Sequence, residues 1–426
     1  MWQSVVMGDA SLRSTRAVIH ITSDALTLVA GLPVLARTVL TLWSAGITRF
    51  TLVDDIPNPA ATYAAALSEI GRVAPGARLS WISSTAPDPN AHVGPRVLIV
   101  PTSGILHVGL ITRLAAGPEN ISITLPGTTK AGLRLLSADH YQQHARDEHA
   151  ATARSTLLDG EYFPTGTEAE VEAAERGLFR WCTKETDGIV SRNLNRPISN
   201  WISRRLSHGQ IRPIRLTTVT GLSALAMFAA LLGSTEQLVA LGCLLYHITS
   251  VLDGLDGEIA RAKYMSSARG ATLDTAVDMA TNLLFILGIS VGTHQVYDPI
   301  YGWVGGYVVF TALVAMMVMA LTLHFGPGGG SFDVLQMAIR RRLRGSQRLS
   351  RAFSFINAFF KRDLFAFVFA ILGVTGFAAV IPWLLAFGAT VWLIAILANV
   401  PTLLSCRRED VLPPHILSAR TTGPAE

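Results

Sequence analysis

The hydrophobic pattern of the first 180 residues alternates short apolar runs with helix-like stretches. The three clearest runs lie at 16–21, 49–53 and 96–100. Two of them end at the turn formers Asp54 and Pro101, as buried parallel strands do. Residues 32–45 have helical spacing and stop at Gly46, a residue suited to a left-handed helix end. This alternation predicts a soluble α/β domain over residues 1–180.

The rest of the chain is dominated by long apolar stretches. They lie at 216–233, 235–252, 279–297, 301–324, 364–381 and 383–404. Each is near the length that a helix needs to cross about 30 Å of hydrocarbon. The pattern therefore predicts an all-α domain of six transmembrane helices after the α/β domain.

Composition supports a membrane protein. Half of the residues are hydrophobic, the mean hydropathy is +0.39, and only 15% are charged. The net charge of +5 comes from arginines that lie mostly near apolar segments, which favours contact with anionic lipid headgroups or phosphorylated substrates. We therefore expect membrane lipids, and no nucleic acid, among its partners.

The distribution of basic residues predicts the orientation. Alternate loops carry the arginines, whereas the loops around 234–236, 294–300 and 380–382 contain no lysine or arginine. By the positive-inside rule the basic side is cytoplasmic, which places both termini in the cytoplasm of a multi-pass inner-membrane protein. The first 20 residues lack the basic and apolar regions of a cleavable signal peptide.

Residues 181–215 differ from both neighbouring regions. Tryptophans alternate with arginines around the amphipathic pattern PISNWISRRL at 197–206. This pattern predicts an interfacial helix with aromatic and apolar residues inward and arginines toward headgroups; an ordinary solvated linker helix is the alternative. The expected domains are 1–180, the linker 181–215, the membrane domain 216–405 and a cytoplasmic tail 406–426.

Four aspartates follow the second apolar stretch and precede the third. They are Asp253, Asp256, Asp274 and Asp278. On helices, the first pair stands at i,i+3 and the second at i,i+4, so each pair shares one face. Two helix ends can thus bring four carboxylates together.

Carboxylates held this close repel one another, and a bound cation is the economical way to keep them ionised. Oxygen ligands without nearby Cys or His favour Mg²⁺ or Mn²⁺, which in such a setting bind diphosphates. Gly257, Ala260 and Gly270 would let a ligand lie directly against both helices. The chemistry permitted is displacement at phosphorus, with Asp278, by its position, as the base.

Two other interpretations fit acidic residues at this place. They could be solvated, or paired with Arg261, Lys263 and Arg269. A cation-coupled transporter also places acids in its membrane domain, although its acids usually lie near mid-bilayer between repeats. A non-enzymatic transporter or lipid-binding scaffold therefore remains an alternative to an enzyme.

The pattern D-x-x-D-G-x-x-A-R-x8-G-x3-D-x3-D resembles the signature of the CDP-alcohol phosphatidyltransferase family in residue type and spacing, and the resemblance covers about residues 185–405. It implies transfer of a phospho-alcohol group from a CDP-linked donor to an alcohol, with release of CMP, in phospholipid or polar-lipid synthesis. It also implies that the four aspartates bind metal and that Asp278 doubles as the base. The implied CDP-binding residues are Thr217, Gly257, Ala260, Arg261 and Gly270.

One position departs from the family pattern. Many members begin the first span with Pro-Asn-x-x-Thr, and this chain reads Pro213-Ile-Arg-Leu-Thr217, with Ile214 in place of the amide. The departure concerns donor affinity and leaves the metal site untouched. At the other end of the domain, Lys361 and Arg362 open the fifth span, either snorkelling to the interface or reaching the phosphate of the acceptor.

The N-terminal region, with GLPVLARTVLTLWSAGITRFTLV, resembles the Rossmann-type nucleotidyltransferase domain of bifunctional inositol-phosphate cytidylyltransferase and di-inositol-phosphate synthase proteins. The glycine-rich phosphate loop expected after the first strand is absent, since Thr22-Ser-Asp-Ala follows 17–21. Pro101-Thr-Ser stands where the resemblance implies an aspartate. We expect a catalytically silent scaffold, dimerisation or regulatory module; the alternative is an active cytidylyltransferase.

The substrates follow only in outline. The motif recognises the CDP half, so the donor is either CDP-diacylglycerol or a CDP-polyol such as CDP-inositol. The fused domain favours an inositol-like alcohol on one substrate. We also expect a homodimer.

Overall fold

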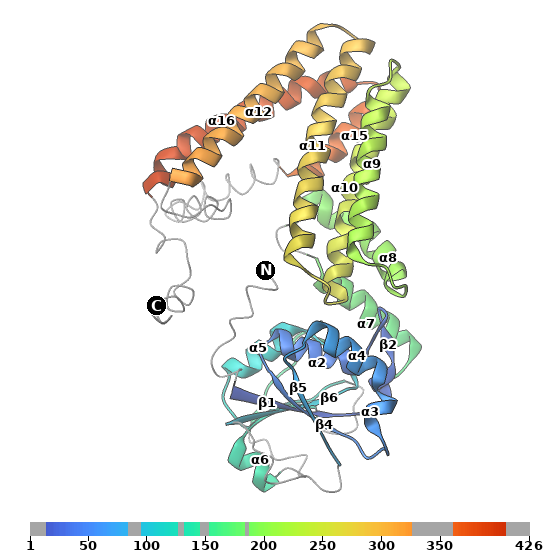
Figure 1. Cartoon of the computed structure of the whole chain (residues 1–426), viewed down its shortest axis with the longest axis vertical. Helices are drawn as coiled ribbons and strands as arrows, with labels where there is room; N and C mark the ends of the chain where they lie inside the picture. The colour runs from blue at the N-terminus through green and yellow to red at the C-terminus, as the bar shows by residue number, and fades with distance from the viewer. Residues whose placement is uncertain are drawn as a thin grey trace. The chain divides into compact units, whose positions relative to one another are not determined.

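The computed structural model shows a chain of two compact units (Figure 1). The described residues are 14–83, 95–126, 132–144, 153–183, 187–325 and 361–405. The first unit comprises Met1–Glu185, Asn200–Pro213 and Gly257–Ser267. The second comprises Thr186–Ser199, Ile214–Asp256 and Ala268–Glu426. Two short pieces of the predicted linker and membrane regions thus belong to the same compact unit as the α/β fold.

The first unit is built on a seven-stranded sheet in the order β10-β8-β9-β6-β1-β4-β5. Its strands are β1 (Thr15–His20), β4 (Arg49–Val53), β5 (Arg78–Ile82), β6 (Arg96–Pro101), β8 (Ile121–Ile123), β9 (Leu133–Ser137) and β10 (Ala153–Arg154). Strand β1 pairs in parallel with both β4 and β6, and Ala17 lies opposite Phe50 and Leu98. Strand β9 is antiparallel to its neighbours β6 and β8. The three predicted strands and their parallel arrangement are confirmed.

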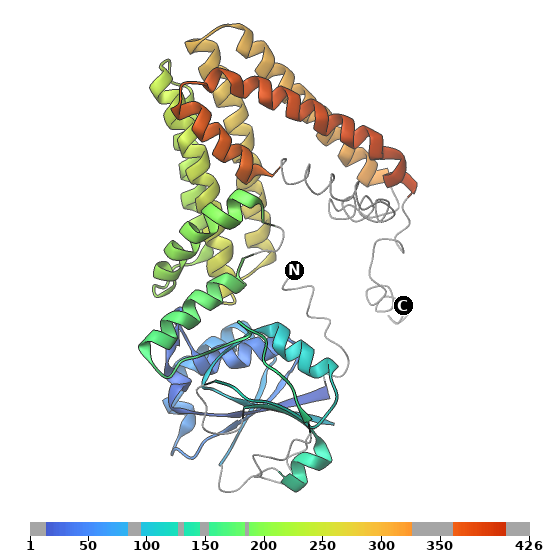
Figure 2. The same ribbon diagram turned by 180° about the vertical axis from the view of Figure 1, so that it is seen from behind.

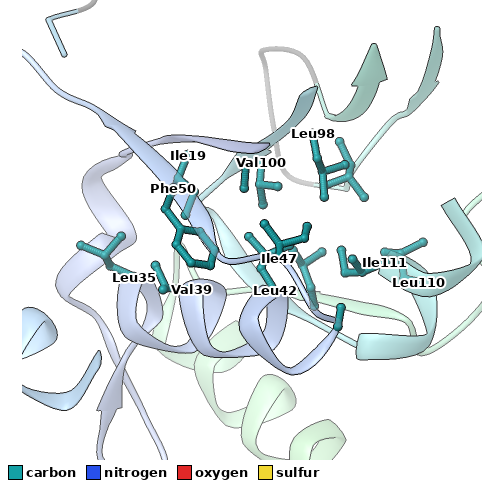
Figure 3. Packing of buried hydrophobic residues seen from close by; sticks show 14 of the residues in the cluster. Ile19, Leu35, Val39, Leu42, Ile47, Phe50, Leu98, Val100, Leu110 and Ile111 are labelled. Atoms are coloured by element: carbon teal, nitrogen blue, oxygen red, sulfur yellow. The ribbon is translucent and has the colours of Figure 1, made fainter. Parts of the chain in front are cut away.

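Helices cover both faces of this sheet. The helices of residues 14–183 are α2 (Val34–Ser44), α3 (Pro59–Thr62), α4 (Ala64–Val73), α5 (Val108–Ala116), α6 (Ala138–His144) and α7 (Glu168–Trp181). Helices α2, α4 and α5 lie on one face and α6 on the other (Figure 1). In the core between α2 and the sheet, Leu35 and Val39 pack near Ile19 and Phe50 (Figure 3). The α/β fold class predicted for this region is confirmed.

Short elements complete the unit. They are the 3₁₀ turn Ser23–Leu26, the hairpin β2 (Leu28–Val29) and β3 (Leu32–Pro33), and the pair β7 (Gly104–Leu106) and β11 (Tyr162–Pro164). The hairpin turns through Ala30 and Gly31, both with positive φ (47° and 76°), which matches the right-handed twist of paired strands. Helix α2 ends just before Gly46, at φ 107°, as predicted.

The second unit is helical. A π-helical turn (Ser191–Asn195) leads into α8 (Arg196–Ser207), and the long helices α9 (Pro213–Leu231), α10 (Glu236–Ala262), α11 (Ala268–Val296) and α12 (Ile300–Phe325) follow. Helix α8 from Asn200 onward and α10 from Gly257 onward belong to the first unit. After residues 326–360, which lie outside the described ranges, come α15 (Arg362–Val374), a 3₁₀ turn (Ala378–Val380) and α16 (Ile381–Ser405). Helices α12 and α16 run side by side (Figures 1 and 2).

Aromatic packing joins three of these helices. The ring of Phe285 on α11 stacks on Tyr246 of α10 at 3.9 Å and on Phe369 of α15 at 5.6 Å between centroids. On the outer surface, large apolar side chains such as Trp303 and Phe310 of α12 are exposed. Exposed apolar side chains of this size suit a hydrocarbon solvent. These features mark the chain as a membrane protein.

The number of full-length spans differs from the prediction. Among the described residues, five helices are long and apolar enough to cross a membrane. The predicted span 364–381 corresponds to α15, whose 13 residues reach only about 20 Å at about 1.5 Å per residue. The helix stops because Gly376 takes a φ of 83°, which turns the chain before α16. Thus the described residues after position 210 contain five long helices and the shorter α15.

Helix α8 has one packed face and one exposed face, and its location at a membrane interface stays a prediction. Its serines Ser199, Ser203 and Ser207 are buried at i, i+4 and i+8, whereas Trp201 and Ile198 are exposed. The guanidinium of Arg205 stacks over the Trp201 ring at 3.7 Å. Small hydroxyl side chains therefore form the packed face because they allow close approach of neighbouring backbone, and the aromatic face points outward.

Candidate functional site

The four aspartates lie on two consecutive helices, as predicted. Asp253 and Asp256 belong to the last three turns of α10, and Asp274 and Asp278 to the first three turns of α11. The spacing of three and four residues places the members of each pair on one face of their helix. All four belong to the second compact unit, with the loop between the helices assigned to the first.

Thr217 of α9 contacts the aspartate group directly. Its hydroxyl donates a hydrogen bond to Oδ2 of Asp256 across 2.5 Å, and both side chains are buried. A hydroxyl is one of few side chains that can satisfy a buried carboxylate without adding charge. Thr217, predicted at a cytidine site, therefore lies beside the carboxylates and orients one of them.

Arg362 brings two of the aspartates together. Its guanidinium lies at the first residue of α15, and Nη2 donates to Oδ2 of Asp253 at 2.7 Å. Nη1 forms an ion pair with Oδ1 of Asp278. One cation thus faces a carboxylate from each of α10 and α11, and it offsets their mutual repulsion. Lys361, the other predicted basic residue, precedes α15 in an extended conformation.

The chemistry of the donors fits a hard divalent cation. The side chains available are four carboxylates and the Thr217 hydroxyl, all oxygen donors of the kind that Mg²⁺ and Mn²⁺ prefer. The place between Asp253 and Asp278 already attracts a positive charge, that of Arg362. Across the described ranges, no three His, Cys, Asp or Glu side chains are gathered closely enough to hold a metal.

Asp363, next to Arg362, is a residue that the sequence did not point to. Its carboxylate is buried and accepts a hydrogen bond from the backbone N–H of Ser191 at 2.6 Å. The approach requires Gly188, because a Cβ at that position would lie 2.1 Å from an Asp363 oxygen. The Asp187-Gly188 dipeptide before the membrane domain was the available signal, since such a glycine often allows close backbone approach.

An ion pair joins the two ends of the segment 187–196, which contains Gly188 and Ser191. Arg196 binds Asp187 through two hydrogen bonds, Nε to Oδ2 at 2.8 Å and Nη2 to Oδ1 at 3.1 Å. Both side chains are largely buried, at 12% and 10% exposure. A bidentate pair of this geometry fixes orientation as well as distance. The segment 187–196 is thereby held rigidly where it meets Asp363.

The remaining predicted CDP-binding residues lie around the loop between α10 and α11. Gly257, Ala260 and Arg261 occupy the last two turns of α10, and Gly270 is exposed in the first turn of α11. Nε of Arg261 donates to the carbonyl oxygen of Cys182 at 2.9 Å. Arg261 also lines a small pocket of the first unit together with Trp181. The Arg261 side chain thus bonds and packs within the first unit.

The turn that follows β1, where the phosphate loop was expected, has no basic side chain and contains the acidic Asp24. After β1 the chain enters the turn Ser23–Leu26, and the N–H of Thr22 donates to Oγ1 of Thr102 at 2.9 Å. Thr102 follows β6 and is fully buried. A neutral hydroxyl pair thus joins these two strand ends.

Residues 211–400 match the model of the CDP-alcohol phosphatidyltransferase family. The N-terminal sheet fits the predicted nucleotidyltransferase-like fold. The chain is similar to proteins named "Bifunctional IPC transferase and DIPP synthase" from several organisms. The protein from Aquifex aeolicus is 38% identical over 133 residues, 31% of this chain and 30% of the relative. The protein from Thermococcus kodakarensis is 35% identical over 164 residues, 38% of this chain and 35% of the relative.

The chain spans about a third of the length of the curated relatives that it matches. A crystal structure of S. aureus TarS 1-349 matches over 60% of this chain and 93% of that chain, at 11% identity and a TM-score of 0.23. That likeness is too low to bear on the fold.

Proposed function

We propose that the protein is a metal-dependent CDP-alcohol phosphotransferase, which moves a phosphatidyl or phospho-polyol group from a CDP-linked donor to an alcohol acceptor and releases CMP. The observation that carries the proposal is the placement of Asp253, Asp256, Asp274 and Asp278 on two consecutive helix ends within a region that matches the family. A transporter has no need of this spacing at one end of two helices.

The reaction is displacement at phosphorus. The oxygen of the acceptor hydroxyl forms a bond to the β-phosphorus of the donor while Asp278 takes the hydroxyl proton. The bond from that phosphorus to the bridging oxygen breaks, and the electron pair leaves with CMP. A Mg²⁺ or Mn²⁺ ion held by Asp253, Asp256, Asp274 and Asp278 would neutralise the diphosphate charge.

Other residues of this chain bind and orient. Thr217 keeps the Asp256 carboxylate oriented through its hydroxyl. Gly257, Ala260 and Gly270, which have little or no side chain, leave room for the CDP moiety, and Arg261 supplies it with a positive charge. Arg362, with Lys361 beside it, binds the phosphate of the acceptor once substrates enter, because a guanidinium matches phosphate geometry.

The donor is either CDP-diacylglycerol or a CDP-polyol, and one substrate carries an inositol-like alcohol. The names of the relatives, which pair a transferase with a synthase, support this substrate class. We place the active site at the cytoplasmic side of the inner membrane, with both termini cytoplasmic, and we propose a homodimer.

A second candidate function is an active cytidylyltransferase in the α/β domain, favoured by the word "bifunctional" in the relatives' names. The neutral Thr22–Thr102 pair at the strand ends argues against it, because nothing there would cradle a triphosphate. We therefore propose a catalytically silent domain. Diphosphate release from CTP by the full chain would overturn this choice.

Release of CMP by the purified full chain in proteoliposomes, with Mg²⁺ or Mn²⁺ and a series of CDP-alcohols, tests the main proposal. We expect release from the wild type and a decrease of at least about a hundredfold in Asp278→Asn, the usual contribution of a general base. Asp298→Asn is the matched control, because Asp298 lies just beyond the other end of α11 and only caps the next helix, with Oδ1 accepting from the N–H of Ile300. A wild type that releases no CMP from any donor, or an Asp278→Asn variant as active as the wild type, would refute the proposal.

A further inference from the structure

The first compact unit contains the segment that directly follows the first aspartate pair. Residues Gly257–Ser267 pack with the α/β fold, although they include the last turns of α10. Helix α10 is continuous from Glu236 to Ala262, so Asp256 precedes its end by six residues. That separation corresponds to about 9 Å along the helix axis. Asp253 and Asp256 therefore share one continuous helix with the residues that pack with the α/β fold.

Arg37 of α2 holds this end. Its side chain is 2% exposed, and Nη1 donates to the carbonyl oxygen of Ala262 at 2.8 Å. The same guanidinium donates through Nε to Val29 at 2.8 Å and through Nη2 to Ala30 at 3.4 Å, both at carbonyl oxygens. The last carbonyls of a helix lack partners within it, and a positive charge there is favourable. Arg37 thus caps α10 from within the α/β fold.

Tyr264, in the turn after α10, is also held by a contact with α2. Tyr264 has a φ of 53°, an uncommon conformation for a residue with a large side chain. Its hydroxyl lies 2.9 Å from Oγ1 of Thr41. Thr41 stands one turn after Arg37 on α2, so one face of this helix provides both contacts. A strained backbone persists when its surroundings fix it, and here they do.

Further hydrogen bonds fix residues at the end of α10 and in the turn that follows it. Nζ of Lys263 donates to the carbonyl oxygen of Gly209 at 2.6 Å, and Arg72 of α4 donates to the carbonyl oxygen of Lys263 at 3.3 Å. Burial and the nearby Arg37 lower the pKa of Lys263. The hydroxyl of Ser203 donates to the buried Glu258 carboxylate at 2.7 Å. The turn is thus bonded on several sides to one compact unit.

The hairpin turn between β2 and β3 also lies against the end of α8. Gly31 has a φ of 76°, and a Cβ on it would lie 2.4 Å from the carbonyl oxygen of Ser207. Only glycine permits this approach, so the fit between the hairpin and the end of α8 is built into the backbone. The neighbouring Ala30 N–H donates to Oε1 of Glu175 on α7 at 2.8 Å.

We propose that the α/β domain is a clamp that fixes the end of α10, with Arg37 and Thr41 as positioning residues for Asp253 and Asp256. This rests on the proposed function of the aspartates. A displacement of catalytic groups by about 1 Å can reduce a rate about a hundredfold, so a buried cap on the helix that carries them is enough to control activity. The clamp gives the attached domain a role that needs no nucleotide chemistry.

Single-hydroxyl variants of the full chain test the clamp. Thr41→Val and Tyr264→Phe each remove one side of the same hydrogen bond while keeping the shape of the side chain. We expect faster amide hydrogen exchange in 257–267, unchanged exchange in β6, and a decrease of about tenfold in kcat/KM for CMP release. Because the two variants remove the same bond, the double variant should be no worse than either single variant. The control is Thr62→Val, which alters an exposed threonine of α3.

Arg37→Lys and Arg37→Gln extend the test. A lysine can donate to only some of the three carbonyl oxygens, so we expect partial activity in Arg37→Lys and a larger loss of activity in Arg37→Gln. The control is Arg49→Gln at an exposed position, which should be as active as the wild type. Should Arg37→Gln fail to fold, the hydroxyl variants decide the question alone. Unchanged exchange in 257–267, or faster exchange with full CMP release, would overturn the clamp.

If the wild-type chain releases no CMP, the proposed function is wrong, and a second readout must then test the clamp. That readout is Mn²⁺ binding to the full chain, measured by electron paramagnetic resonance. Thr41→Val and Tyr264→Phe should then raise the half-saturating Mn²⁺ concentration several-fold, and Thr62→Val should not. Equal Mn²⁺ binding by all of these variants would overturn the clamp in that case.

Discussion

The backbone N–H of Ser191 donates a hydrogen bond to the carboxylate of Asp363 across 2.6 Å. The two residues are 172 positions apart, and the bond joins the segment before the first long helix to the start of α15. The residue adjacent to Asp363 is Arg362, which pairs with Asp253 and Asp278. The bond therefore fixes the backbone from which Arg362 reaches the aspartates.

Asp363→Ala should weaken acceptor binding. The change leaves the N–H of Ser191 without this acceptor in a partly buried place, and the loss of such a partner typically destabilises by about 1–3 kcal/mol. We expect a KM for the acceptor several-fold higher, and faster hydrogen exchange at Ser191. Asp298→Ala removes a comparable but exposed cap and serves as the control. An unchanged KM for the acceptor would contradict a positioning role for Asp363.

Gly188→Ala should lower the stability of the membrane domain. The added Cβ would lie 2.1 Å from an Asp363 oxygen, and the helix start must shift to accommodate it. Such overpacking costs about 1–3 kcal/mol. Thermal unfolding in detergent measures the effect, and Gly306→Ala is the matched control because nothing lies within 4 Å of a Cβ there. Equal melting temperatures for the two variants would refute the close contact.

Thr217→Val should reduce CMP release while Thr218→Val should not. Of these two threonines, Thr217 donates to the Asp256 carboxylate, whereas the exposed Thr218 donates its hydroxyl to the carbonyl oxygen of Ile214 in its own helix. A hydrogen bond to a charged group contributes about 1.5–3 kcal/mol, so the decrease should be roughly tenfold or more. Steady-state rates with a saturating donor measure it. Similar rates for the two valine variants would show that the Asp256 contact is dispensable.

Arg362→Gln should strengthen Mn²⁺ binding and weaken acceptor binding. The guanidinium offsets two carboxylates, and without it their negative charge attracts a divalent cation more strongly. We expect the Mn²⁺ concentration for half-maximal thermal stabilisation to fall several-fold, together with a higher KM for the acceptor. Arg205→Gln changes an arginine that stacks on Trp201 and provides the control. An unchanged Mn²⁺ concentration for half-maximal stabilisation would contradict the inference that Arg362 competes with the cation for these carboxylates.

Cys182 should be unreactive below pH 9 in the folded chain. Burial raises the pKa of its thiol from 9.0 to about 11. A group whose pKa is raised on folding stabilises the fold fully below its unfolded pKa, and this contribution is lost as the pH rises through its folded pKa. Stability should therefore fall as the pH rises from 9 to about 11, by about 1.4 kcal/mol for each pH unit.

Alkylation followed by mass spectrometry measures the reactivity of Cys182, at pH 8, in native and in urea-unfolded protein. Tyr63 and Tyr162 titrate in a neighbouring pH range, because burial raises the pKa of each to about 12. The Cys182→Ala variant therefore separates the effect of the thiol on stability from the effect of these tyrosines. Equal alkylation in the native and the unfolded protein would show that the thiol is accessible. A pH dependence of stability that is the same in Cys182→Ala would show that another group causes it.

The fold was predictable where the pattern is local. Apolar runs bounded by turn residues identified β1, β4 and β6, and their parallel pairing followed from the alternation with helices. The i,i+3 and i,i+4 spacing of the aspartates was enough to place each pair on one face of a helix. The length of α15 was not predictable in this way, because the left-handed turn at Gly376 divides an apolar stretch whose composition does not change.

The sequence by itself therefore determined the α/β domain, the apolar helices and the carboxylates, since each depends on residues within a few turns of one another. Only the tertiary structure decided which distant residues serve that site: Arg362 meets Asp253 across 109 positions, and Arg37 meets Ala262 across 225. These contacts depend on the packing of elements far apart in the chain. No local period encodes them, because a buried arginine has the same appearance in sequence as an exposed one.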